Sequence, residues 1–307
     1  MTSQTSLIPS ISYAELVHHD NDTRYMATAQ LTQALKVYGA CRIRDHGIPQ
    51  HIIDNCLEKC EGFFAGTAGE KATDGTHPSA RFVPFASEKI RGEAHRSEAM
   101  EFQSSVYEQA GKWSEQGRQL VDALKPFHEE CNRIMVHLLD GISASLNLTR
   151  SLNAIHSKHN SFFAPYHYRF EDSQDDNNPL RVPPHIDPTT MLLCYQDSYA
   201  GLEVADLSNM SRNLSTTVIQ KTATFIPTNC QPGEFVLLAG HILRRLVPDM
   251  KHSVHRVKRP VGTSGFHLNY WIIPDLDTGC DFGDKKEDVT EYMTRVFPAA
   301  LQNTVQV

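Results

Sequence analysis

Hydrophobic positions follow a helical period in the first half of the chain and a strand-like period in the second. The clearest helix is predicted over residues 113–146, where apolar side chains recur at alternating steps of three and four. These are Leu120, Leu124, Phe127, Cys131, Ile134, Leu138 and Ile142. A helix with one apolar face must lie on another layer, so we expect it to buttress a sheet or barrel.

Another helix, a strand and a further helix are expected nearer the amino terminus. Residues 23–37 carry an imperfect helical stripe. The run 38–49 indicates a strand that ends in a glycine turn, after which Pro49 starts a helix that continues to about Phe64. Residues 65–111 show no clear period, so we expect a loop with short elements over the mouth of a site.

The second half alternates short strand-like runs with turns. These runs are 162–169, 190–196, 201–205, 223–227, 234–239, 253–258 and 266–273. Strands without long helices indicate an antiparallel sandwich or barrel, and hence an α+β protein with a mainly β core. The polar stretch between Ala205 and Ala223 is expected to be an exposed loop. Residues 286–296 are expected to form a short helix that packs back on the amino-terminal part.

One stretch of the strand-rich half contains half of a metal site. Residues i and i+2 of a strand point to the same face, so His185 and Asp187 can direct an imidazole and a carboxylate at one point. His255, on a later strand, would complete two imidazoles and one carboxylate, which suits Fe(II) and leaves positions open. His-x-Asp alone is a weak signal in a chain with 16 histidines. A zinc hydrolase is a weaker alternative.

The segments around these residues resemble a known family. Residues 183–190 (PPHIDPTT), 201–204, 232–240 and 255–257 occur in the order and spacing of the isopenicillin N synthase-like branch of the Fe(II)/2-oxoglutarate-dependent oxygenases. Residues 179–187 are similar to the same point in deacetoxycephalosporin synthases. The resemblance favours the iron site over a chance triplet.

The resemblance implies a fold, a metal and a reaction class. The fold would be a double-stranded β-helix, or jelly roll, with iron held by His185, Asp187 and His255 near one open end. The co-substrates would be 2-oxoglutarate and dioxygen. The enzyme would hydroxylate, desaturate or cyclise a small organic substrate, in specialised metabolism.

The change from helical to strand-like patterns, together with the resemblance, divides the chain into four expected parts. The expected parts are an amino-terminal oxygenase region (1–112), a buttressing helix and connection (113–160), the iron-binding core (161–280) and a carboxy-terminal helix and tail (281–307).

One part of the family pattern is missing. The family pairs the far carboxylate of 2-oxoglutarate with the arginine of an Arg-x-Ser motif, because a bidentate cation suits a carboxylate in a partly dry barrel. Counted back from Pro274, the arginine position falls on Gly265 and the serine position on His267. Tyr168 matches the family's tyrosine on the first barrel strand, and His267 or Arg169 offers further donors.

The missing arginine leaves three hypotheses open. Other residues hold 2-oxoglutarate, or the protein is a 2-oxoglutarate-independent Fe(II) oxidase of isopenicillin N synthase type, in which the substrate supplies the electrons. In the third, the protein is a non-catalytic ligand-binding relative, against which the intact His185, Asp187 and His255 argue.

Composition narrows the partners of the protein. A formal net charge of −7 argues against a general binder of nucleic acid or anionic membranes, which needs a clustered basic face. No apolar run reaches the roughly 18 residues of a membrane-spanning helix, and the start of the chain lacks a secretory pattern. Seven cysteines in no framework spacing predict free thiols and a cytoplasmic location. The sequence does not determine an oligomeric state.

Overall fold

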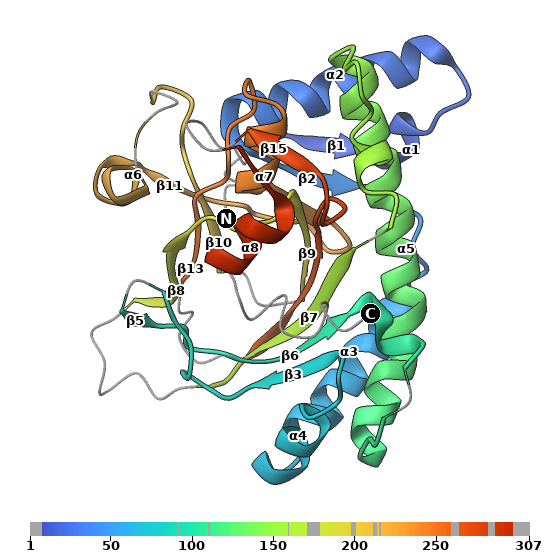
Figure 1. The fold of residues 1–307 in the computed structure, drawn as a ribbon, viewed down its shortest axis with the longest axis vertical. Helices are drawn as coiled ribbons and strands as arrows, with labels where there is room; N and C mark the ends of the chain where they lie inside the picture. The colour runs from blue at the N-terminus through green and yellow to red at the C-terminus, as the bar shows by residue number, and fades with distance from the viewer. Residues whose placement is uncertain are drawn as a thin grey trace.

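Two mainly antiparallel sheets lie at the centre of the molecule, and the long helix α5 (Glu115–Ser145) runs along one side of them (Figure 1). The structure is a computed structural model that describes residues 8–90, 92–109, 111–158, 160–170, 179–197, 201–210, 214, 216–258, 264–281 and 286–296.

The larger sheet has eight strands and the smaller sheet has four. In spatial order the larger contains β1 (Ser10–Ser12), β2 (Ala40–Arg44), β12 (Phe235–Ala239), β9 (Met191–Gln196), β14 (Gly265–Ile272), β7 (Ser161–Tyr168), β6 (Glu98–Gln103) and β3 (Ala80–Val83). The smaller contains β11 (Phe225–Pro227), β10 (Leu202–Ala205), β13 (His255–Lys258) and β8 (Leu180–His185). Short hairpins join β4 (Lys89–Ile90) to β5 (Glu93–Ala94) and β15 (Gly279–Asp281) to β16 (Lys286–Asp288). All seven predicted strand runs are confirmed, and the fold is the expected α+β jelly roll.

Helices α2 (Asn21–Tyr38), α3 (Gln50–Ala65) and α5 share one apolar core with the larger sheet. The other helices are α1 (Tyr13–Leu16), α4 (Ala68–Asp74), α6 (Thr216–Thr222), α7 (His241–Leu246) and α8 (Val289–Val296). The predicted apolar face of α5 is buried at every position named above. Phe127 of α5 contacts the rings of Phe163 on β7 and Phe235 on β12, with centroids 5.6 and 5.9 Å apart. The buttressing role predicted for this helix is therefore confirmed.

A glycine sets the turn between α2 and β2. Gly39 ends α2 in the left-handed conformation (φ 68°), and a Cβ there would lie 2.8 Å from the Lys251 carbonyl oxygen and the His252 carbonyl carbon. Only glycine fits both the dihedral angle and this close backbone approach. The turn lets β2 enter the large sheet beside β12.

Residues 65–111 contain the expected short elements and line the cavity, but they form more regular structure than a loop. This region contains α4 and two strands of the large sheet, β6 paired with β7 and β3 paired with β6. The apolar alternation that marks a strand is masked here, because Glu98 on β6 is buried as an ion-pair partner rather than exposed.

Two other expectations also need correction. Between Ala205 and Ala223 the described residues include α6, and Leu207 and Ile219 are buried against Val254 rather than exposed. Among the described residues, the carboxy-terminal helix α8 packs on α7 and on the segment after β14, with Val289, Tyr292 and Met293 in one cluster with Ile242 and Ile273, rather than in a cluster with the amino-terminal part.

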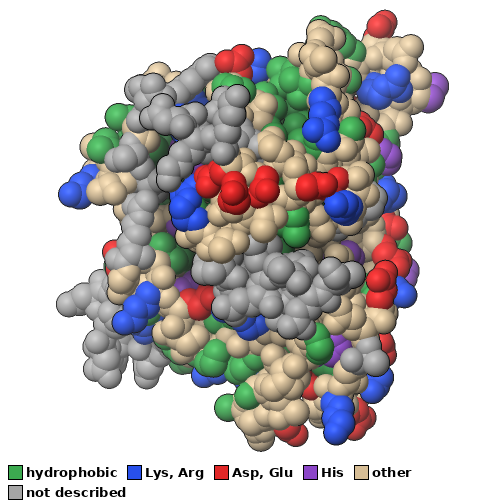
Figure 2. All heavy atoms as spheres, in the orientation of Figure 1, with side chains coloured by type: hydrophobic (Ala, Val, Ile, Leu, Met, Phe, Trp, Pro, Cys, Tyr) green, Lys and Arg blue, Asp and Glu red, His purple; other side chains and the backbone are tan. Residues whose placement is uncertain are grey.

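Two features relate to the expectation that the protein is not a general binder of nucleic acid or membranes: the hydropathy of its helices and the charge of its surface. None of the described helices is long and apolar enough to cross a membrane. On the face shown in Figure 2, the described lysine and arginine side chains are scattered among acidic ones and do not gather into a basic patch.

A buried carboxylate ties α4 to the sheet. Glu98 is 1% exposed and accepts hydrogen bonds from Lys71 Nζ (2.9 Å), His167 Nδ1 (3.0 Å) and the Arg169 guanidinium (2.8 and 2.7 Å). Burial by itself raises the pKa of Glu98, but the hydrogen bonds from His167, Arg169 and Lys71 outweigh it and hold this pKa well below its ordinary value. The ionised form of Glu98 therefore stabilises the fold.

Replacing this carboxylate tests its contribution. Glu98→Gln leaves Lys71 buried without its counter-charge, so the free energy of unfolding at neutral pH should fall by about 3 kcal/mol in urea denaturation. Because the pKa is lower in the folded state, the contribution of Glu98 is complete above the unfolded-state pKa. This contribution is lost as pH falls towards the folded-state pKa of Glu98. The difference in the free energy of unfolding between wild type and variant should therefore become smaller below about pH 5. Glu58→Gln, at a side chain 70% exposed, is the control and should change little.

Candidate active site

The two histidines of the predicted triad face each other across one strand pair. His185 ends β8 and His255 begins β13, and the antiparallel register of these strands pairs the two residues directly. Their ring centroids are 4.1 Å apart. Asp187 lies just past the end of β8 rather than on the strand, so the turn after His185 brings its carboxylate to the same side. Ligand atoms of all three residues lie within 4.8 Å of one another.

Hydrogen bonds set the tautomers of both imidazoles. His185 Nδ1 lies 2.9 Å from the Pro183 carbonyl oxygen, and His255 Nδ1 lies 3.4 Å from that of Ser253. A carbonyl can only accept, so each Nδ1 carries a hydrogen, and Nε2 is the nitrogen left to bind a metal. The Nε2 atoms lie 3.6 and 4.0 Å from the Asp187 carboxylate oxygens. Two imidazoles oriented by backbone carbonyls, together with one carboxylate, form a ligand set that fits a divalent iron.

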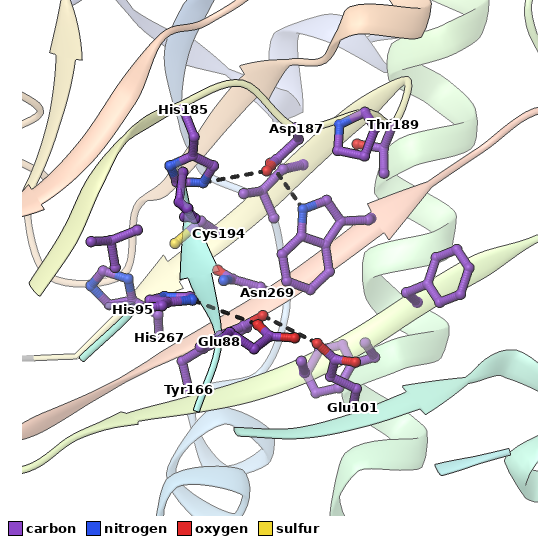
Figure 3. A pocket seen from close by; sticks show the side chains of 18 of the residues that line it. Glu88, His95, Glu101, Tyr166, His185, Asp187, Thr189, Cys194, His267 and Asn269 are labelled. Carbon is purple, nitrogen blue, oxygen red and sulfur yellow. Dashed lines mark hydrogen bonds and ion pairs between the residues drawn. The ribbon is translucent and has the colours of Figure 1, made fainter. Parts of the chain in front are cut away.

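Asp187 is held from two sides. Trp271 Nε1–H donates to Asp187 Oδ2 at 2.9 Å (Figure 3), and the backbone N–H of His241 donates to the Asp187 carbonyl at 2.8 Å. Gly240 permits the second contact, because a Cβ at this position would lie 1.9 Å from the Thr189 carbonyl oxygen. The carboxylate therefore has a fixed orientation before a metal binds.

The triad opens into a cavity of about 590 Å³ between the two sheets. Aromatic residues of β7 and β14, including Phe162 and Trp271, line one part of it, and β3, β6 and the β4–β5 hairpin supply polar and charged side chains. Of the residues suggested above for contacts to the co-substrate, Tyr168 and His267 line this cavity. Their rings make an edge-to-face contact with centroids 4.7 Å apart.

The cavity is built without an arginine at the position that the family pattern leads one to expect. Gly265 begins β14 and is paired in register with Tyr168 on β7. Arg169 is hydrogen-bonded to Glu98 and is not among the described residues that line the cavity. Tyr168 and His267 are therefore the two of these three candidates that the structure places in the wall of the cavity.

Several functional residues were not identified from the sequence. Trp271, Asn269, Arg81, Glu88 and Glu101 line the cavity. The alternation of His267, Asn269 and Trp271 along β14 could have indicated the first two, because residues i, i+2 and i+4 share one face. No comparable signal existed for Arg81 and Glu101, because the strands that carry them were not recognised, or for Glu88, which lies just before β4.

Comparison with known families agrees with this geometry. Residues 158–274 match the model of the 2OG-Fe(II) oxygenase superfamily, and residues 8–122 match that of the non-haem dioxygenase in morphine synthesis N-terminal region. The chain belongs to the Fe(II)/2-oxoglutarate oxygenase superfamily. This oxygenase family uses Fe(II), 2-oxoglutarate and dioxygen, which supports the first of the three hypotheses left open by Gly265.

Individual relatives are distant but cover most of this oxygenase. The 2-oxoglutarate-dependent dioxygenase htyE of Aspergillus rugulosus is 25% identical over 281 residues, which span 83% of this chain and 81% of that protein. The proline hydroxylase buaE of Petromyces alliaceus is 22% identical, over 92% of this chain and 89% of its own. Among solved structures, that of a full-length Neurospora crassa protein in complex with alpha-KG has a TM-score of 0.78 at 16% identity, covering 96% of this chain and 97% of that one. The structural likeness shows the shared fold.

The hydrogen bond from Trp271 to Asp187 generates a prediction. Trp271→Phe keeps an aromatic ring but removes the N–H donor, so the affinity of the oxygenase for Fe(II) should fall by about tenfold in an anaerobic titration. Trp113→Phe is the matched control, because Trp113 stacks on His77 (centroids 4.5 Å apart) and does not line the cavity. Equal Fe(II) affinity in the Trp271 variant and the wild type would show that this contact does not orient the ligand.

Proposed function

We propose that this oxygenase oxidises a small organic substrate in the cavity, with His185, Asp187 and His255 as iron ligands and Tyr168 and His267 as anchors for 2-oxoglutarate. The observation that carries the proposal is the direct pairing of His185 with His255 next to the Asp187 carboxylate. Bound iron would supply the activation of dioxygen, with 2-oxoglutarate as the reductant.

The protein's own residues perform the positioning. The backbone carbonyls of Pro183 and Ser253 orient the two imidazoles, and Trp271 orients the carboxylate. The Tyr168 hydroxyl and the His267 ring offer hydrogen-bond donors at the place where Gly265 lacks a side chain. Neutral donors bind a carboxylate less strongly than a guanidinium does, so we expect a weaker affinity for 2-oxoglutarate than an arginine anchor would give.

The setting of the reaction is part of the proposal. Relatives named for proline hydroxylation and for gibberellin oxidation support a small-molecule substrate, and we infer a role in specialised metabolism. The described free cysteines are Cys41, Cys56, Cys60, Cys131, Cys194 and Cys230. Free thiols support a cytoplasmic location.

Optical titration tests the iron and co-substrate sites together. Anaerobic protein mixed with Fe(II) and 2-oxoglutarate should develop the weak visible charge-transfer absorption that keto acid chelation produces. The absorption should be lost in His185→Ala, because the metal loses a ligand, and retained in the control His51→Ala, at an exposed histidine of α3. An unchanged absorption in His185→Ala would contradict the assignment of the iron ligands.

The same absorption tests the anchor of the co-substrate. Tyr168→Phe and His267→Leu should each raise the 2-oxoglutarate concentration at half-saturation by about tenfold, because each removes one hydrogen-bond donor to the far carboxylate. Arg169→Gln should leave it unchanged, since Arg169 is engaged by Glu98. The reverse pattern, with only the Arg169 variant affected, would move the anchor to Arg169.

A further inference from the structure

A row of side chains crosses the floor of the cavity from β14 to β3. Asn269 of β14 is paired with Ala164 of β7, and the register of β7 with β6 puts Glu101 opposite Ala164. Glu101 is in turn paired with Arg81 of β3. All four residues line the cavity. The row therefore presents the Asn269 amide, the Glu101 carboxylate and the Arg81 guanidinium to a bound molecule, with the small side chain of Ala164 between the amide and the carboxylate.

The charges in this wall do not balance. The Arg81 guanidinium lies 2.8 Å from a Glu88 carboxylate oxygen and 2.7 Å from one of Glu101, so one cation serves two carboxylates. The three side chains are 33, 30 and 20% exposed, so solvent screens this charge only in part. His95 Nδ1 lies 3.8 Å from Glu88, and Lys89 is exposed at the outer rim. Arg81 Nε also donates to Glu101 Oε2 at 2.8 Å, and the two carboxylates together with this one guanidinium leave one net negative charge in the wall.

Burial makes this carboxylate pair receptive to a cation. Burial raises the pKa of Glu101, and Arg81 only partly opposes the effect. Tyr166 OH donates to Glu101 Oε1 over a long 3.4 Å, which leaves that oxygen weakly compensated. A half-buried carboxylate with incomplete compensation gains more from a charged donor than from a neutral one.

Asn269 is a second hydrogen-bond acceptor, on the other side of Ala164 from Glu101. Asn269 is 8% exposed, and its Oδ1 has no hydrogen-bond partner among the described residues. A buried amide oxygen without a partner is costly, so a ligand donor at this point would be stabilised. In Figure 3, Asn269 lies below His185 and Asp187, and Glu88 and Glu101 lie further below; all three line the cavity. The acceptors therefore face the space where a substrate must lie.

We propose that the substrate carries a protonated amino group, and that Glu101 is the residue that selects it while Asn269 accepts a second hydrogen bond from the same group. The proposal rests on the proposed function, because the same cavity must hold the iron and 2-oxoglutarate. Trp271 is two residues beyond Asn269 on β14, about 7 Å away, and contacts Asp187. The oxidised carbon therefore lies roughly that distance from the nitrogen, and Phe162 and Trp271 pack against the apolar part between them.

Three probes with one skeleton separate the alternatives. Phenethylamine, 2-phenylethanol and 3-phenylpropionate are cationic, neutral and anionic, and each spans roughly the 7 Å between the two rows. Each is added to anaerobic protein loaded with Fe(II) and 2-oxoglutarate, and its dissociation constant is taken from the change in the charge-transfer absorption. The amine should bind at least about tenfold more tightly than the alcohol or the carboxylate.

Variants assign the preference to Glu101. Glu101→Gln should abolish the preference for the amine and leave the affinity for the alcohol unchanged. Glu203→Gln is the matched control, since Glu203 is a buried glutamate paired with Arg256 and Lys258 and does not line the cavity. If Glu101→Gln does not fold, Asn269→Ala replaces it and should weaken amine binding by about fivefold.

Several outcomes would overturn this inference. They are tighter binding of the alcohol or the carboxylate, a preference for the amine that persists in both the Glu101 and the Asn269 variants, and an amine that causes no change at about 10 mM. A protein that never develops the charge-transfer absorption would instead refute the proposed function, because that absorption precedes any probe.

Discussion

The continuous pairing of β14 with β7 on one side and β9 on the other is the constraint on which the site depends. Because the side chains of a strand alternate, this register places His267, Asn269 and Trp271 together on the cavity face, and a slip of one residue would turn all three outward. The opposite face of the sheet packs on α5, where residues such as Phe127 are fully buried. A slip would therefore also expose the core, so the packing that stabilises the fold and the register that builds the cavity are one requirement.

The position of Asp187, one of the three proposed metal ligands, depends on the same sheet through its hydrogen bond from Trp271. This residue joins the large sheet to Asp187, while the histidine pair belongs to the smaller sheet. The triad is thus assembled at the place where the two sheets meet. Backbone carbonyls close in sequence orient the two imidazoles. The carboxylate of Asp187 is instead oriented by Trp271, which lies 84 residues further along the chain. Loss of the packing between the sheets would separate these two parts.

Strand β6 carries two carboxylates with different surroundings. Glu98 is completely buried and accepts hydrogen bonds from two cations and a histidine, so its charge is fully compensated and its role is structural. Glu101, three residues later, faces the cavity and shares one guanidinium with Glu88. The fold therefore supplies enough hydrogen-bond donors and positive charge to balance Glu98, but it balances the charge of Glu101 only in part. Only the second can contribute to the recognition of a ligand.

The sequence alone predicted the periodic elements and the three proposed iron ligands. The stripe of α5 and the seven strand runs depend on local alternation, and His185, Asp187 and His255 stand in a spaced pattern that the chain itself displays. It also showed that Gly265 replaces the expected arginine. The tertiary structure decided which residues line the cavity. Arg81 and Glu101 lie on strands whose buried charges hide the apolar alternation, and Trp271 meets Asp187 only when distant strands pack. Ion pairs and contacts between sheets are set by positions in space that no local pattern encodes, which is why these residues emerged only from the fold.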